Sequence, residues 1–71
     1  MTDSKKMELL AELFEVEVAE ITPEKQLSEL NWDSMNMLGL IALFKAELDI
    51  KLTPEKLRTF KTINDILLEM K

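Results

Sequence analysis

The chain has 71 residues, a net charge of −5 and a hydrophobic content of 46%, and it contains neither cysteine nor histidine. This length suffices for one small domain at most, and the hydrophobic share argues against disorder. Without cysteine and histidine, disulfides and Ser–His or Cys–His catalytic arrangements are excluded, and a structural zinc site is not expected. We therefore expect residues 1–71 to form one domain held by helix packing. We also expect that this domain is not an enzyme.

The charge is unevenly distributed along the chain. Residues 1–33 carry nine acids and three bases, a net −6, whereas residues 34–71 carry five acids and six bases, a net +1. Nucleic acid is not an expected partner because phosphate contacts need clusters of Lys and Arg, whereas basic protein partners are favoured. There is neither an apolar run of membrane-spanning length nor a signal-peptide pattern, so we expect a cytoplasmic protein. We also expect it to be a monomer.

The first predicted helix runs from Asp3 to Glu15. Its apolar residues recur at helical spacing and define one buried stripe: Met7, Leu10, Ala11 and Phe14. Residues 16–32 have weaker periodicity and predict a long loop, anchored by Val16, Val18 and Ile21. Residues 26–30 could form a single helical turn within this loop.

Three further helices follow the loop. Asp33 is the expected N-cap of a second helix over residues 34–48. Thr53 and Pro54 begin a short third helix that ends near residue 58 or 59. Thr62 caps the last helix, with Asp65 completing a capping box. The predicted fold is all-α: a small four-helix bundle with three longer helices, a short third helix and a long loop between the first and second helices.

The second helix is apolar on two faces. We assign one face to the core, which comprises Met37, Leu40, Ile41, Phe44 and Leu48. The other face lies next to Ser34 and comprises Met35, Leu38 and Ala42, with Gly39 beside them. Such a helix either has a docking face or packs its second face under the loop. A glycine inside a helix costs about 1 kcal/mol relative to Ala, which the close approach of another molecule would explain.

Ser34 stands where the long loop meets the second helix. Its hydroxyl would occupy the first helical position, beside unpaired N–H groups and the positive end of the helix dipole, which stabilise an attached phosphate. The alternative is that Asp33 or Ser34 serves only as a helix cap.

Four segments resemble the acyl carrier protein family, in order and at its spacing, over nearly the whole chain. The family's Asp-Ser-Leu signature reads Asp33-Ser34-Met35, and residues 27–30 resemble its approach to the modified serine. Residues 40–50 resemble its second helix and the ending of that helix. Residues 62–66 resemble the start of its last helix.

The resemblance implies a carrier. A phosphopantetheinyl transferase would move 4′-phosphopantetheine from coenzyme A to Ser34. The thiol of this arm would then hold acyl or aminoacyl groups as thioesters for loading and transferring enzymes. Asp33 would be the acidic neighbour that contacts the transferase. Met35 and Leu38 would be docking positions, extended by Gly39 and Ala42. Trp32 would either pack into the core or flank the arm.

Two departures from the family pattern narrow the expected role. Fatty-acid carriers usually have a strongly acidic second helix, whereas this one contains Asn36, Gly39 and Lys45. The glycine that commonly precedes the motif is replaced by Asn31. These differences indicate a dedicated biosynthetic pathway and not general fatty-acid synthesis. The alternative to a carrier is a helical protein-interaction module without a prosthetic group.

Overall fold

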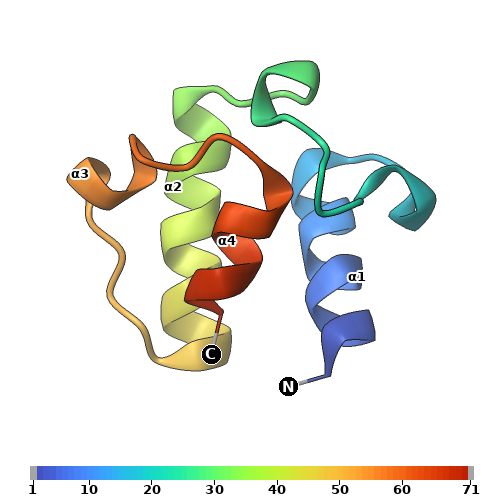
Figure 1. Cartoon of the computed structure of the whole chain (residues 1–71). Coiled ribbons are helices and arrows are strands. Elements are labelled where there is room, and N and C mark those ends of the chain that lie inside the picture. The colour runs from blue at the N-terminus through green and yellow to red at the C-terminus, as the bar shows by residue number, and fades with distance from the viewer. Residues whose placement is uncertain (1, 71) are drawn as a thin grey trace.

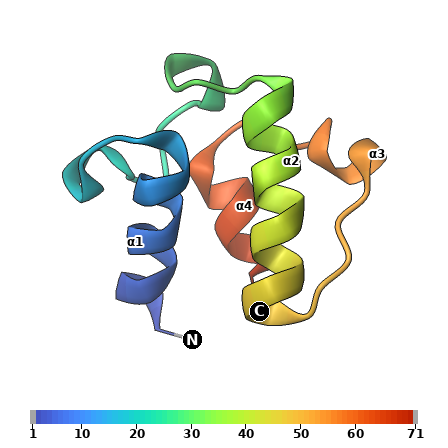
Figure 2. The same cartoon turned by 180° about the vertical axis from the view of Figure 1, so that it is seen from behind.

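The computed structural model describes residues 2–70. Its elements in chain order are α1 (Asp3–Phe14), η1 (Val18–Glu20), η2 (Leu27–Glu29), α2 (Ser34–Leu43), η3 (Phe44–Leu48), α3 (Pro54–Leu57) and α4 (Ile63–Glu69). Helices α1 and α2 run in opposite directions, and α3 lies on the outer side of α2, away from α1 (Figures 1 and 2). Residues 2–70 contain no strand, which confirms the predicted all-α fold with four helices.

The predicted helix starts are confirmed by their caps. Asp33 accepts a hydrogen bond from the Asn36 N–H, and Thr53, just before Pro54, accepts one from the Lys56 N–H. Thr62 and Asp65 form the expected capping box. These side chains satisfy backbone N–H groups that have no partner inside the first helical turn.

Two helices end earlier than predicted, and the end of a third has a different helical form. Helix α1 ends at Phe14 because Glu15 adopts a left-handed conformation, with φ of 57°. The second helix reaches Leu48 as predicted, but its last five residues form a π-helical segment, η3. This segment ends at Asp49, which is also left-handed, with φ of 55°. Helix α3 ends at Leu57, slightly earlier than expected.

The long loop contains two short 3₁₀ turns, each closed by a capping box. Glu17 and Glu20 close η1, and Gln26 and Glu29 close η2, which is the turn predicted at residues 26–30. The predicted anchor Ile21 is buried. Val18 was expected to be an anchor as well, but this is wrong because it begins η1 on the surface and is 47% exposed.

Backbone hydrogen bonds join the loop to the start of α4. The N–H groups of Ile63 and Asn64 donate to the carbonyls of Lys25 and Pro23, at 2.9 and 3.0 Å. In return, the Leu27 N–H donates to the Lys61 carbonyl at 2.8 Å. These bonds fix the second half of the loop, and therefore the approach to α2.

The core lies between the longer helices. Its fully buried large side chains come from the loop and from every longer helix: Leu10, Phe14, Leu27, Leu40, Phe44, Ile63, Ile66 and Met70. Trp32 is half-buried against this core, with its ring centroid 6.2 Å from that of Phe14. Of the two alternatives for Trp32, the structure therefore supports packing against the core.

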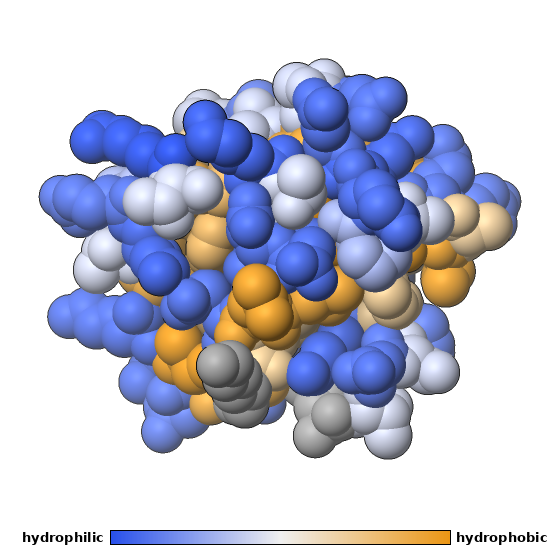
Figure 3. All heavy atoms as spheres, viewed as in Figure 1, coloured by the Kyte–Doolittle hydropathy of each residue, from blue (hydrophilic) through white to orange (hydrophobic). Residues whose placement is uncertain are grey.

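The surface is mostly hydrophilic on the face that Figure 3 shows. Hydrophobic residues gather there near the C-terminal end of α4, where Leu68 is 56% exposed. No helix within residues 2–70 is long and apolar enough to cross a membrane.

The capping box of α4 predicts a pH dependence of stability. The backbone N–H groups of Lys61 and Thr62 donate to the Asp65 carboxylate, at 2.8 and 3.1 Å, and they lower the pKa of Asp65 below its ordinary value of 3.8. This contribution to stability is therefore present above the ordinary pKa and is lost as the pH falls through the folded-state pKa. We expect Asp65→Asn to lower the thermal midpoint at pH 6, with the difference from the unmodified chain closing in acid. A gap of constant size from pH 6 to pH 2 would contradict this explanation.

Candidate functional site

Ser34 is the first residue of α2 and is exposed. The Asp33 side chain accepts the Asn36 N–H at 2.9 Å, so Asp33, and not Ser34, is the helix cap. This leaves the serine hydroxyl at the surface, at the positive end of a ten-residue helix. The position suits a covalently attached phosphate.

The first turn of α2 is also tied to the loop before it. The Asn36 side chain donates a hydrogen bond to the Asn31 carbonyl. The contact uses the backbone carbonyl of Asn31 and does not depend on its side chain. Together with the Asp33 cap, this contact holds both sides of Ser34.

A groove opens beside Ser34, between α2 and α3. It has a volume of about 300 Å³ and is lined mainly by apolar side chains, with one arginine: Ser34, Met37, Leu38, Ile41, Pro54, Leu57 and Arg58. Met37 and Ile41 were assigned to the core. They pack against it but are only partly buried, so they also form the groove wall.

Three of the four predicted docking residues form an exposed face of α2. Met35 is 78% exposed, Leu38 is 67% exposed and Ala42 is exposed. Their spacing of three and four residues places them on one side of the helix, next to Ser34. The alternative that Met35 and Leu38 pack under the loop does not agree with this exposure.

Gly39 has a different setting from the other three docking candidates. It is partly buried, and a Cβ atom at this position would lie only 2.6 Å from Cδ1 of Leu13 on α1. An alanine here would require the end of the flexible Leu13 side chain to move, so the packing of α1 against α2 favours glycine at this position.

Helix α3 contributes to the site, which the sequence pattern did not predict. Pro54, Leu57 and Arg58 line the groove beside Ser34, although they are 20 or more residues away in the chain. The Thr-Pro start identified the helix but did not indicate that it packs beside the first turns of α2. The resulting site is one exposed hydroxyl at a helix start, flanked by an apolar groove and an apolar face, as in a carrier of a phosphate-linked group.

Comparison with known protein families matches residues 7–68 to the family described as phosphopantetheine attachment site. The match covers most of the chain, which therefore belongs to this family of phosphopantetheine-carrying proteins. Family members hold 4′-phosphopantetheine through a covalent bond, and such carrier domains are generally not catalytic. The resemblance to a phosphopantetheine-carrying family, which the sequence predicted, is therefore confirmed.

The residues around Ser34 fit this prosthetic group. The hydroxyl is accessible, the start of α2 favours an attached phosphate, and the groove offers an apolar surface along which an arm could lie. Arg58 is the only charged residue in the groove lining.

The two faces of the second helix, formed by α2 and its continuation η3, should respond differently to truncation. Phe44 is fully buried, so Phe44→Ala should lower the free energy of unfolding by about 3–5 kcal/mol. Met35 is mostly exposed, so Met35→Ala should change it by less than about 0.5 kcal/mol. Urea unfolding followed by circular dichroism measures both values. Equal losses would contradict the assignment of the two faces.

The explanation of Gly39 predicts a coupling between α1 and α2. In the unmodified chain, Gly39→Ala gains helix propensity but must displace Leu13. In a Leu13→Ala background the obstacle is absent, so Gly39→Ala should stabilise the protein by about 1 kcal/mol. A double-mutant cycle in urea gives the coupling. If Gly39→Ala has the same effect in both backgrounds, Leu13 does not explain the glycine.

Proposed function

We propose that this chain is a carrier that holds acyl or aminoacyl groups on a 4′-phosphopantetheine arm attached to Ser34. The observation that carries the proposal is the position of Ser34 in a chain of this family: an exposed hydroxyl at the start of α2, beside an apolar groove. The whole sequence, residues 1–71, would form the single carrier domain.

The arm would supply chemistry that the chain lacks. A chain without cysteine has no thiol, whereas the thiol of the arm forms thioesters. In the loading reaction, the Ser34 hydroxyl oxygen bonds to the phosphorus of coenzyme A that carries pantetheine. The bond from this phosphorus to the bridging oxygen of the pyrophosphate breaks, 3′,5′-ADP leaves, and the hydroxyl proton passes to a base of the transferase. The helix start holds the resulting phosphodiester charge.

Two groups of residues are proposed to contact partner enzymes. Asp33 would offer its second carboxylate oxygen to the phosphopantetheinyl transferase, while its first oxygen caps α2. Met35, Leu38 and Ala42 would dock the transferase and the enzymes that load and unload the arm. We leave Gly39 out of this docking face because Leu13 accounts for it.

The absence of charge on α2 supports a specialised role. Residues 34–43 contain no charged side chain, so an enzyme that recognises an acidic second helix would find no ion pairs there. We infer that the carrier serves a dedicated biosynthetic pathway and has few partners. We also propose that it acts in the cytoplasm as a monomer. Because Phe44 and Leu40 are fully buried in the core, the cargo would lie in the surface groove.

Transfer of the arm tests the proposal directly. The chain is incubated with coenzyme A, Mg²⁺ and a transferase of broad specificity, and is then weighed by mass spectrometry. We expect the mass to rise by one phosphopantetheine group in the unmodified chain and to stay constant in Ser34→Ala.

A neighbouring change serves as the matched control. Ser28 is exposed in the loop, so Ser28→Ala removes a hydroxyl without touching α2 and should accept the arm normally. If the folded chain gains no mass while a known carrier is modified in the same tube, the proposal fails and an interaction module without a prosthetic group is favoured. Mass gain in Ser34→Ala would place the attachment elsewhere.

A further inference from the structure

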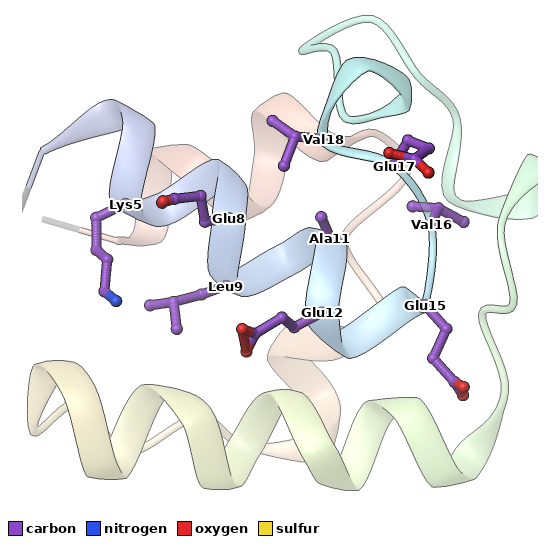
Figure 4. Close-up of a pocket in the computed structure, with 9 residues that line it drawn as sticks. All are labelled: Lys5, Glu8, Leu9, Ala11, Glu12, Glu15, Val16, Glu17 and Val18. Atoms are coloured by element: carbon purple, nitrogen blue, oxygen red, sulfur yellow. The ribbon is translucent and has the colours of Figure 1, made fainter.

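A second groove lies between α1 and η1. It has a volume of about 480 Å³, and its lining combines apolar side chains with four glutamates and one lysine: Lys5, Glu8, Leu9, Ala11, Glu12, Glu15, Val16, Glu17 and Val18. Figure 4 shows Val18 projecting from the η1 side over α1. None of these residues lines the groove beside Ser34, so this is a separate surface.

The apolar part of the groove is open to a partner. Val18 is 47% exposed, and Leu9 and Val16 are only partly buried. These side chains form a floor that an apolar side chain of another protein could cover. Burial of such surface favours binding.

The carboxylates around this floor form no salt bridges. Among residues 2–70, no salt bridge involves Glu8, Glu12, Glu15 or Glu17, although Glu17 takes part in the capping box of η1. Glu12 lies in the last turn of α1 and Glu15 caps it, and this turn holds no basic residue. Carboxylates at a helix C-terminus are unfavourable, and Glu8 and Glu12 repel each other at i, i+4 spacing. The free protein thus loses stability by holding these acids at this end of α1.

The carboxylates are arranged for several separate cations. They lie spread along α1 and into the following turn (Figure 4), and no group of three or more acidic residues within residues 2–70 could hold a metal ion. Several amino or guanidinium groups on one extended segment match this spacing, whereas a single metal ion does not. Amino or guanidinium groups bound at the end of α1 would supply the positive charge that the last turn of this helix lacks.

The geometry points to a docking site in the α1–η1 groove for a basic, amphipathic segment of a partner protein. Lys or Arg side chains of this segment pair with Glu8, Glu12 and Glu15, and an apolar side chain covers Val18. The site does not depend on the modification of Ser34.

The test uses the full chain carrying Ser34→Ala, so that its result is independent of the proposed carrier function. The probe is a synthetic helical peptide of Lys, Leu and Ala, titrated into the ¹⁵N-labelled chain and followed by NMR. We expect shifts confined to residues 5–18 and weaker binding at 0.5 M salt. Glu8→Gln with Glu12→Gln should weaken binding about fivefold. Val18→Ser should weaken it about threefold without altering the charge.

The matched control changes two exposed acids outside the groove, Glu24→Gln with Glu47→Gln, and keeps the same net charge as the groove variant. It should bind the peptide normally. The proposal would be overturned if the control variant bound the peptide as weakly as the groove variant does, or if the peptide shifted NMR signals mainly on α2. It would also be overturned if millimolar Mg²⁺, or a higher concentration of the chain alone, produced the same shifts.

The single change Glu12→Gln should also raise the thermal midpoint of the free chain. A lower midpoint would show that Glu12 stabilises the fold.

Discussion

The backbone hydrogen bonds between the long loop and the start of α4 hold the rest of the structure in place. They pair Lys25 with Ile63 and Leu27 with Lys61, and they bring Leu27 into the core beside the first residues of α4. Without them the loop would be anchored mainly by single apolar side chains such as Ile21. The loop leads directly to Asp33, so this pairing also fixes the position in space of the start of α2 and of the Ser34 hydroxyl. A chain with no disulfide thus positions its site through a few backbone contacts between distant segments.

The second helix, α2 with its continuation η3, has one buried and one exposed apolar face. Leu40 and Phe44 fill the core, whereas Met35 and Leu38 remain exposed one or two turns away on the other side. Between these faces, Met37 and Ile41 both pack on the core and form the wall of the groove. The exposed face can therefore change without loss of the fold.

Local signals in the sequence predicted the helix starts, because a cap depends on residues three positions apart. Contacts between distant segments were not predictable in this way. Gly39 is explained by Leu13 of another helix, and Arg58 reaches the site only because α3 packs on α2. The segment Thr-Pro-Glu-Lys shows the same limit. It begins α3 at residues 53–56, but at residues 22–25 it forms only a turn, since Pro23 and Lys25 bond to the α4 segment.

The charge-free α2 has a kinetic consequence. The α2 face has no charge of its own, so contacts made there change little with ionic strength. The net charge of −5 lies on the rest of the chain and still steers basic molecules toward it. In the carrier proposed above, the rate of capture would therefore depend on salt, whereas the lifetime of a complex would depend on how well the partner fits Met35 and Leu38.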